Sequence, residues 1–351
     1  MDYQERYFFN TSYVSQQDKP VEYYMYNIVH KLKQSVVKRV DNCEREVASL
    51  LSGGLDSSLI SALVCQEYHK KTGKKLKTYS IGLDCGVDLK YSELVATHIG
   101  SEHVSIVVSN DDFIDSIESV IKDVESYDTT TVRASVGNWN VAKYIKENSN
   151  AKVIFNGDGA DELMGGYMYF HCASDDHEFH DETIRLLKDI SKFDVLRSDK
   201  CISSHGLEPR TPFLDKDFTK FYLSIPTKYR NHNKYGDCEK YLIRKSFEIY
   251  SPELLPKEVL WRKKEAFSDG VSSQDKSWYE IIQEHISLDE KRNMTYSHND
   301  PLTNEQLYFR EIYEKYYQRC ELLVPYFWMP RFIDGVFDAS ARTLDVYKNR
   351  T

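Results

Sequence analysis

The sequence predicts an α/β fold in which a parallel sheet carries helices on both faces and a mostly helical part follows it. Three observations lead to this prediction. Short apolar runs of strand length alternate with helical apolar periods from residue 21 to about residue 180. A glycine-containing loop directly follows the first of these runs. From about residue 181 to residue 348 the apolar periods are mostly helical.

The predicted elements follow one another in the order strand, turn, helix. A first helix spans residues 21–40, because apolar residues from Tyr24 to Val36 share one face. The segments that follow give predicted strands at 46–51, 77–83, 103–108 and 152–156 and helices at 58–68, 91–99, 113–124 and 134–146. No glycine- and serine-rich linker interrupts the chain, so we expect one unit at 21–348, preceded at 1–20 by an extension or remnant linker.

Composition and charge exclude several classes of function. The net charge of -9 argues against nucleic-acid binding, which requires clustered basic residues. The 7 cysteines are scattered without a CxxC pair, so neither a disulfide framework nor a zinc site is predicted. No apolar run reaches membrane-spanning length, and the N-terminal residues lack the pattern of a signal peptide. We therefore expect a cytoplasmic protein that binds neither membranes nor nucleic acid.

The loop after the first strand reads SGGLDSS over residues 52–58. Gly53 and Gly54 allow the backbone to approach a phosphate closely, while the loop amides and the next helix N-terminus supply donors. The hydroxyls of Ser52, Ser57 and Ser58 add further donors. No GK[ST] follows the glycines, so kinase-type transfer of a γ-phosphate is not predicted. The alternative is an ordinary glycine turn with a serine cap.

Five segments, in this order, resemble those of a known family. SGGLDSS is similar to the pyrophosphate loop of ATP pyrophosphatases, which cleave ATP between its α and β phosphates. The other four segments resemble the synthetase domain of the asparagine synthetase family, and they read YDTTTVRAS (127–135), NGDGADELMGGY (156–167), EPRTPFLD (208–215) and WRKKEAFSDG (261–270). The resemblance implies an adenine nucleotide α-hydrolase-like fold and the ATP-dependent amidation of aspartate to asparagine. This reaction proceeds through β-aspartyl-AMP and releases AMP and pyrophosphate.

Magnesium is expected at the phosphates, because the charge of departing pyrophosphate must be neutralised. Asp56 in the first loop and Asp161 in NGDGADE follow different predicted strands, so their carboxylates can share this ion. Asp161 can also be read as a helix cap. The resemblance further implies that Leu51 and Ile81 hold the adenine and ribose of ATP.

Other nucleotide contacts are also implied by the resemblance. Asn156 and Gly157 would contact the nucleotide, and Arg133 would bind its phosphates. Thr130 and Thr131 would act as hydrogen-bond donors in the same region.

The second half-reaction, attack of ammonia on the acyl-adenylate, needs a stabiliser of negative charge and a proton acceptor. The resemblance assigns the first role to Lys264, next to Lys263, which reads as a solvated neighbour. It assigns the second role to Asp158, where the family usually has a glutamate that is longer by one methylene. Asp194 and Arg197 match a charged pair that would contact aspartate, although charges on an ordinary helix face look the same.

The nitrogen source and two alternatives remain open. Only about 20 residues precede the similarity, which is too few for the glutaminase domain of glutamine-dependent members. Ammonia is therefore expected to be free or to come from a separate glutaminase subunit. One alternative is another carboxylate-adenylating ligase of the β-lactam synthetase type. The other is a non-catalytic nucleotide-binding homologue, which is favoured if Asp158 has abolished the chemistry.

Overall fold

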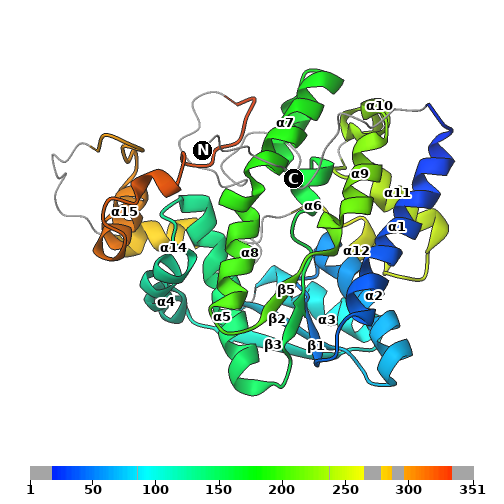
Figure 1. Cartoon of the computed structure of the whole chain (residues 1–351), viewed down its shortest axis with the longest axis horizontal. Coiled ribbons are helices and arrows are strands. Elements are labelled where there is room, and N and C mark those ends of the chain that lie inside the picture. The colour runs from blue at the N-terminus through cyan, green and yellow to red at the C-terminus, as the bar shows by residue number, and fades with distance from the viewer. Residues whose placement is uncertain (1–17, 85, 237, 265–277, 287–295, 334–351) are drawn as a thin grey trace, which may run out of the picture.

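The fold is organised around a five-stranded parallel sheet. The computed structural model describes residues 18–84, 86–236, 238–264, 278–286 and 296–333. The strand order is β3-β2-β1-β4-β5, and all of the pairings are parallel (Figure 1). The strands are β1 (Val47–Leu50), β2 (Lys77–Leu83), β3 (Glu102–Val108), β4 (Val153–Phe155) and β5 (Glu208–Arg210).

The strand order reverses at β1. From β1 the chain builds β2 and then β3 on one side, and it returns to form β4 and β5 on the other side. Ser49 of β1 pairs with Thr78 of β2 and with Phe155 of β4, so the loops after β1 and β4 leave the same edge of the sheet. A crevice at such a reversal is where α/β proteins bind ligands.

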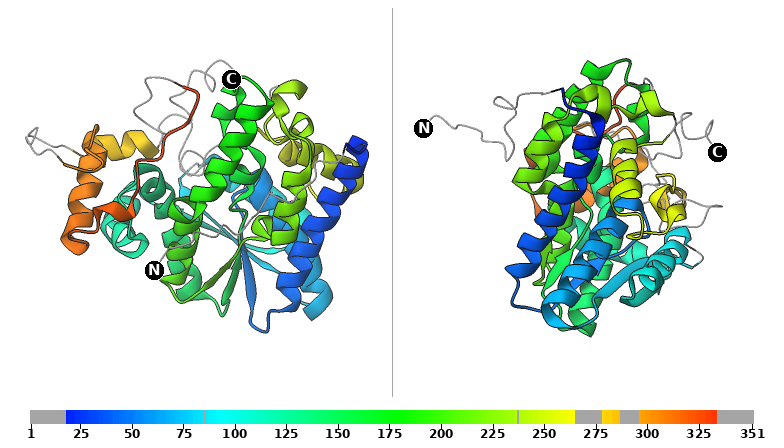
Figure 2. Two further views of the ribbon diagram at one scale, coloured as in Figure 1. Left: turned by 45° about the horizontal axis from the view of Figure 1, so that its top comes forward. Right: turned by 90° about the vertical axis from the view of Figure 1, so that its right-hand side faces the viewer.

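Helices cover both faces of the sheet, as the sequence predicts (Figure 2). Alternate residues of a strand point to opposite faces, so Val153 and Phe155 of β4 join one core while Ile154 joins the other. The first core contains α1 (Val21–Asp41), α2 (Leu55–Thr72) and α3 (Val87–Ile99). The second contains α4 (Asn110–Val124), α5 (Thr129–Asn148) and α8 (Asp194–Ser203).

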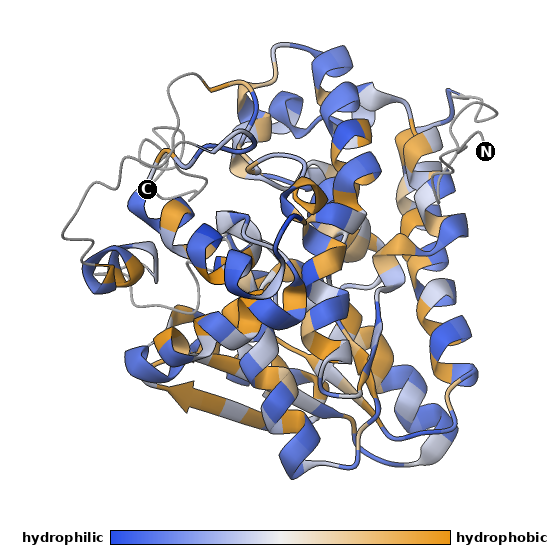
Figure 3. Ribbon diagram, turned by 60° about the vertical axis from the view of Figure 1, so that its left-hand side comes forward, coloured by the Kyte–Doolittle hydropathy of each residue, from blue (hydrophilic) through white to orange (hydrophobic). Residues whose placement is uncertain are grey.

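The rest of the described chain is mostly helical, as predicted. In Figure 3 the helices have apolar and polar sides, whereas the strands are largely apolar. Residues of α11 (Tyr241–Tyr250) and α12 (Lys257–Leu260) extend the first core, and those of α14 (Trp278–His285) and α15 (Asn304–Tyr316) extend the second. The other helices are α6 (Ala160–Met164), α7 (Asp176–Asp189), α9 (Lys216–Ser224) and α10 (Thr227–Arg230). None of the described helices is long and apolar enough to cross a membrane.

Several features of the sheet region differ from the sequence prediction, among them the starts of α3 at Val87 instead of residue 91 and of α5 at Thr129 instead of residue 134. β5 was not predicted, because its sequence Glu-Pro-Arg is polar and proline is uncommon in strands; this proline lies at the sheet edge, where only β4 is a partner. α2 begins at Leu55 instead of residue 58, since Gly53 has a φ of 77° and Gly54 caps the helix. Asp56 and Ser57 therefore lie in the first helical turn. The division into an N-terminal extension, an α/β part and a helical part, at about residues 20 and 180, remains a prediction. Residues 1–17, 265–270 and 334–348, which belong to predicted segments, lie outside the described residues.

Candidate functional site

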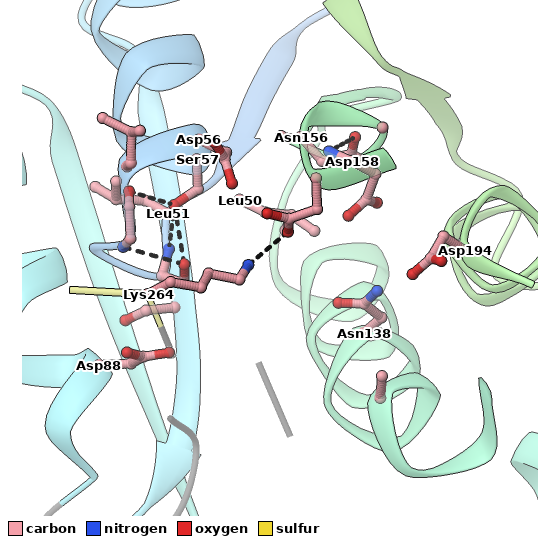
Figure 4. A pocket seen from close by; sticks show the side chains of 18 of the residues that line it. Leu50, Leu51, Asp56, Ser57, Asp88, Asn138, Asn156, Asp158, Asp194 and Lys264 are labelled. Carbon is pink, nitrogen blue, oxygen red and sulfur yellow. Dashed lines mark hydrogen bonds and ion pairs between the residues drawn. The ribbon is translucent and has the colours of Figure 1, made fainter. Parts of the chain in front are cut away.

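A cavity of about 190 Å³ lies beside the carboxyl ends of β1, β2 and β4. Figure 4 shows Asp88 and Asp194 on opposite sides of it, with Lys264 reaching in between. Fourteen of the predicted site residues line this cavity, and they are Leu51, Ser52, Gly54, Asp56, Ser57, Ile81, Thr130, Asn156, Gly157, Asp158, Asp161, Asp194, Arg197 and Lys264. Residues from four of the five sequence segments therefore meet at one place.

The loop after β1 is held by its own hydroxyl groups. The side-chain oxygens of Ser52 and Ser57 lie 2.9 Å apart, and the Ser57 hydroxyl also accepts a hydrogen bond from the Ser52 amide at 3.2 Å. Gly53 lies outside the cavity lining, and a Cβ there would be 2.5 Å from the backbone nitrogen of Ser92. Ser58 is also outside the lining and is fully buried. Gly53 and Ser58 therefore pack on the side of the loop that faces away from the cavity.

The loop after β4 touches the loop after β1 directly. A Cβ on Gly157 would lie 2.7 Å from the Ser57 nitrogen and 2.8 Å from the Asp56 carbonyl carbon. Asn156 is buried, and its side-chain amide donates to the Ser198 hydroxyl at 2.7 Å. The two loops therefore form one continuous wall.

Replacing Gly157 with alanine is expected to separate these loops and weaken nucleotide binding at least about tenfold, because backbone atoms cannot yield to a Cβ at 2.7 Å. Calorimetric titration with ATP would measure the change. Gly73→Ala is the control, since this glycine has a φ of 71° but no atom near a Cβ. It should lower stability by about 1 kcal/mol and leave nucleotide affinity intact. Equal affinities in the two variants would contradict the prediction.

Two acidic side chains meet two lysines in the cavity. Lys240 forms ion pairs with both Asp56 and Asp161, and Lys264 lies 2.5 Å from the second oxygen of Asp161. Burial alone raises the pKa of Asp161, but the charges of Lys240 and Lys264 outweigh it and hold this pKa below its ordinary value. Burial lowers the pKa of Lys264, but Asp161 and Asp56 outweigh it and raise this pKa. The pKa shifts of Asp161 and Lys264 therefore both favour the charged forms of these two groups.

The acidic pair fits a magnesium ion. The carboxylates of Asp56 and Asp161 converge on the same point, and oxygen is the ligand atom that magnesium prefers. The Oδ1 atom of Asp56 is buried and has no hydrogen-bond partner among the described residues. Asp161 also belongs to the first turn of α6, but its side chain does not cap this helix, because Gly159 is the N-cap residue. The residues can therefore hold the metal that the sequence predicts.

The other end of the cavity carries a second charged network. Arg197 lies 2.9 Å from Asp194 and 3.7 Å from Asp158. The Tyr167 hydroxyl donates to Glu162 and lies 3.2 Å from Asp194. Burial raises the pKa of Asp158, although Arg197 opposes this effect. Burial together with the Asp194 charge raises the pKa of Glu162 well above its ordinary value. At this end of the cavity a polar ligand could therefore contact one cationic group, Arg197, and several acidic side chains.

The structure places Arg133 and Thr131 away from the cavity. Arg133 is buried against α15, where its Nε atom donates to Glu305 at 2.7 Å and its guanidinium lies 4.5 Å from the Tyr279 ring centroid. Thr131 donates from both its amide and its hydroxyl to Asp128, the N-cap residue of α5. Neither residue belongs to the cavity lining. We therefore leave both out of the proposed site, and only Thr130 of this segment remains.

Several lining residues were not found by sequence reasoning. Lys240 comes from the turn before α11, where no glycine pattern or strand end marks it. Asp88 and Arg262 form an ion pair of 2.7 Å across 174 positions of the chain, and Arg262 also lies over the Tyr91 ring. Only the tertiary fold brings such residues together. Glu162 and Tyr167 lie inside a recognised segment, so their position in NGDGADELMGGY was an available signal.

Comparisons with known proteins identify the family. The family model described as asparagine synthase matches residues 27–176 and 171–323. The glutamine-hydrolysing asparagine synthetase of Gallus gallus is 44% identical over 328 residues, and that of Homo sapiens is 40% identical over 330 residues. Each match covers 92% of this chain and 58% of the relative, so the chain spans somewhat more than half the length of these proteins.

Solved structures with some likeness include an NMN synthetase from Francisella tularensis, at 18% identity and a TM-score of 0.29 over 67% of this chain and 94% of that one. An NAD+ synthetase from Burkholderia pseudomallei matches at 14% identity and a TM-score of 0.28 over 68% and 90% of the two chains. The family assignment depends on the asparagine synthase family model, which matches most of the chain. The chain belongs to the asparagine synthase family.

Proposed function

We propose that this chain is a ligase that converts aspartate to asparagine at the expense of ATP, with release of AMP and pyrophosphate. The observation that carries the proposal is one cavity with two differently charged ends. One end holds Asp56, Asp161 and two lysines, which suits a metal-bound polyphosphate. The other end holds Asp194 and Arg197, which suits the amino and carboxylate groups of an amino acid.

The nucleotide would lie along the carboxyl ends of β1 and β2. Leu51 and Ile81 line this part of the cavity and would contact adenine and ribose. The backbone around Ser52 to Ser57 would hold the phosphates through amides and hydroxyls at the start of α2. Asp56 and Asp161 would hold magnesium, which neutralises phosphate charge when it is bound.

The amino-acid substrate would lie between the two ends. Arg197 would bind the α-carboxylate and Asp194 the α-amino group, because their charges are complementary. The β-carboxylate would then face the phosphates. One of its oxygens attacks the α-phosphorus of ATP, the bond to the bridging oxygen breaks, and pyrophosphate leaves. β-Aspartyl-AMP is the product of this first step.

Ammonia completes the reaction. It attacks the carbonyl carbon of β-aspartyl-AMP, a proton passes from nitrogen to Asp158, and AMP departs with the bonding electrons. The raised pKa of Asp158 favours its role as proton acceptor. Lys264 would stabilise the negative charge that develops on the carbonyl oxygen. Ammonia would be free or supplied by a separate glutaminase subunit.

An assay of pyrophosphate release and asparagine formation tests the proposal. The purified chain would receive ATP, magnesium and aspartate, together with ammonia, glutamine or no nitrogen source. Asparagine formed with ammonia, at one pyrophosphate per asparagine, would support the proposed reaction. Nucleotide binding without aspartate-dependent pyrophosphate release would contradict it. In that case a ligase of the β-lactam synthetase type or a non-catalytic homologue would be the better description.

A further inference from the structure

The ammonium group of Lys240 lies where the two proposed metal ligands converge. Its Nζ atom is 2.6 Å from Asp161 and forms a second ion pair with Asp56. Only 1% of the Lys240 side chain is exposed. Within the described residues no group of three or more acidic, histidine or cysteine side chains is arranged to hold a metal ion. The two carboxylates that would bind a metal are therefore already paired with the ammonium group of Lys240.

The surrounding structure is built to place Lys240 at this point. Its backbone has a φ of 55°, which non-glycine residues adopt rarely, and it is the N-cap residue of α11. The adjacent Glu239 forms a buried ion pair with Arg244, which also donates to the Leu260 carbonyl at 2.6 Å. A Cβ on Gly166 would lie 2.2 Å from Cε of Lys240. The end of the Lys240 side chain thus lies directly against Gly166, where a larger side chain would displace it.

The charges of the cluster are balanced without a metal. Asp56 and Asp161 carry two negative charges, and Lys240 and Lys264 carry two positive ones. A divalent cation that enters alone meets two ammonium groups at close range, which is unfavourable in a partly buried site. ATP brings additional negative charge, and its phosphate oxygens are suitable partners for a displaced ammonium group.

We propose that Lys240 is a resident counter-ion of the Asp56–Asp161 pair, which a divalent cation displaces efficiently only when the nucleotide phosphates arrive to receive the lysine. Metal and nucleotide then bind as one unit, and the metal alone binds poorly. This inference rests on the proposed function for the nucleotide, but not on aspartate or ammonia.

Binding of Mn2+ tests the inference without any measurement of turnover. The free-ion electron paramagnetic resonance signal would be titrated for the wild-type chain, with and without α,β-methylene-ATP, which cannot be cleaved at the α–β bond. The same titration would be made for Lys240→Met, Lys240→Gln and Lys240→Arg. Lys245→Met is the matched control, because Lys245 lies in the helix that Lys240 caps and forms a partly exposed ion pair with Glu248. Thermal unfolding with and without Mn2+ would accompany each titration.

The expected result is a gain of metal affinity. Without nucleotide, Lys240→Met and Lys240→Gln should bind Mn2+ at least about tenfold more tightly than the wild type, and Mn2+ alone should raise their unfolding temperatures. In the wild type the analogue should raise Mn2+ affinity at least about a hundredfold, while in Lys240→Met the gain should be smaller. Lys240→Arg and Lys245→Met should resemble the wild type.

Two results would overturn the inference. One is nucleotide-free Mn2+ binding in Lys240→Gln that is no tighter than in the wild type. The other, which needs no variant, is wild-type Mn2+ binding that is equally tight with and without the bound analogue. Failure to bind the analogue at all would instead refute the proposed nucleotide site, and the nucleotide-free titrations would still test Lys240. A chain that binds Mn2+ as expected but makes no asparagine would retain this inference and lose the proposed reaction.

Discussion

Replacing Glu305 with glutamine is expected to lower the free energy of unfolding by about 3 kcal/mol or more, because it removes the carboxylate charge that pairs with the buried Arg133 guanidinium. Both side chains are almost completely buried, at 4% and 0% exposure. Gln283 of α14 donates to the same carboxylate at 2.9 Å, so the pair joins α5, α14 and α15. Urea unfolding followed by circular dichroism would measure the loss.

An exposed ion pair of α15 provides the matched control for Glu305→Gln. Glu118 pairs with Lys315 of α15 at 3.5 Å on the surface, with 49% of the Glu118 side chain exposed. Glu118→Gln should therefore change stability little, since exposed ion pairs contribute under about 1 kcal/mol. If Arg133 binds ATP phosphates, as the family resemblance implies, Glu305→Gln would leave unfolding unchanged and would raise KM for ATP.

Replacing Lys264 with methionine is expected to reduce asparagine formation by about 10²- to 10³-fold, the usual effect of removing one fixed donor that stabilises a developing negative charge. Its ammonium group lies 2.5 Å from Asp161, inside the cavity. Folding should persist, because Lys240 still pairs with Asp161 after the substitution. Steady-state kinetics with ammonia would show the loss mainly in kcat.

The half-reactions separate two roles for Lys264. If it stabilises only the attack of ammonia, aspartate-dependent formation of AMP and pyrophosphate continues in a single turnover while asparagine formation falls. If it also stabilises the departing pyrophosphate, both fall together. Lys257→Met is the control, since Lys257 is exposed and outside the cavity lining. Wild-type kcat in Lys264→Met would remove this residue from the proposed catalytic group.

The parts of the fold that could be predicted from the sequence depend on local patterns. Four strands and most of the first helices follow from apolar periodicity, and their order implies the parallel sheet. The loops at Ser52 and Asn156 could be placed because each directly follows an apolar strand. Their meeting in one cavity then follows from the topology of the fold.

The remaining features depend on distant partners. Lys240 reaches Asp56 over 184 positions, and Arg133 meets Glu305 over 172. No local spacing encodes either contact. The TTTVR motif correctly directs attention to α5, but only Thr130 of its predicted ligands reaches the cavity, because one helix points its side chains in several directions.

The direct contact between Gly157 and the loop around Asp56 has a consequence for how this chain can evolve. Atoms this close allow neither loop to change shape unless the other changes with it. A side chain at position 157 would require a compensating rearrangement near residue 56, so we expect single substitutions at position 157 to be more harmful than a matched pair of substitutions. Although the two loops are far apart in the sequence, we expect substitutions in one loop to depend strongly on the residues of the other. A library of double variants should show this dependence as strong epistasis.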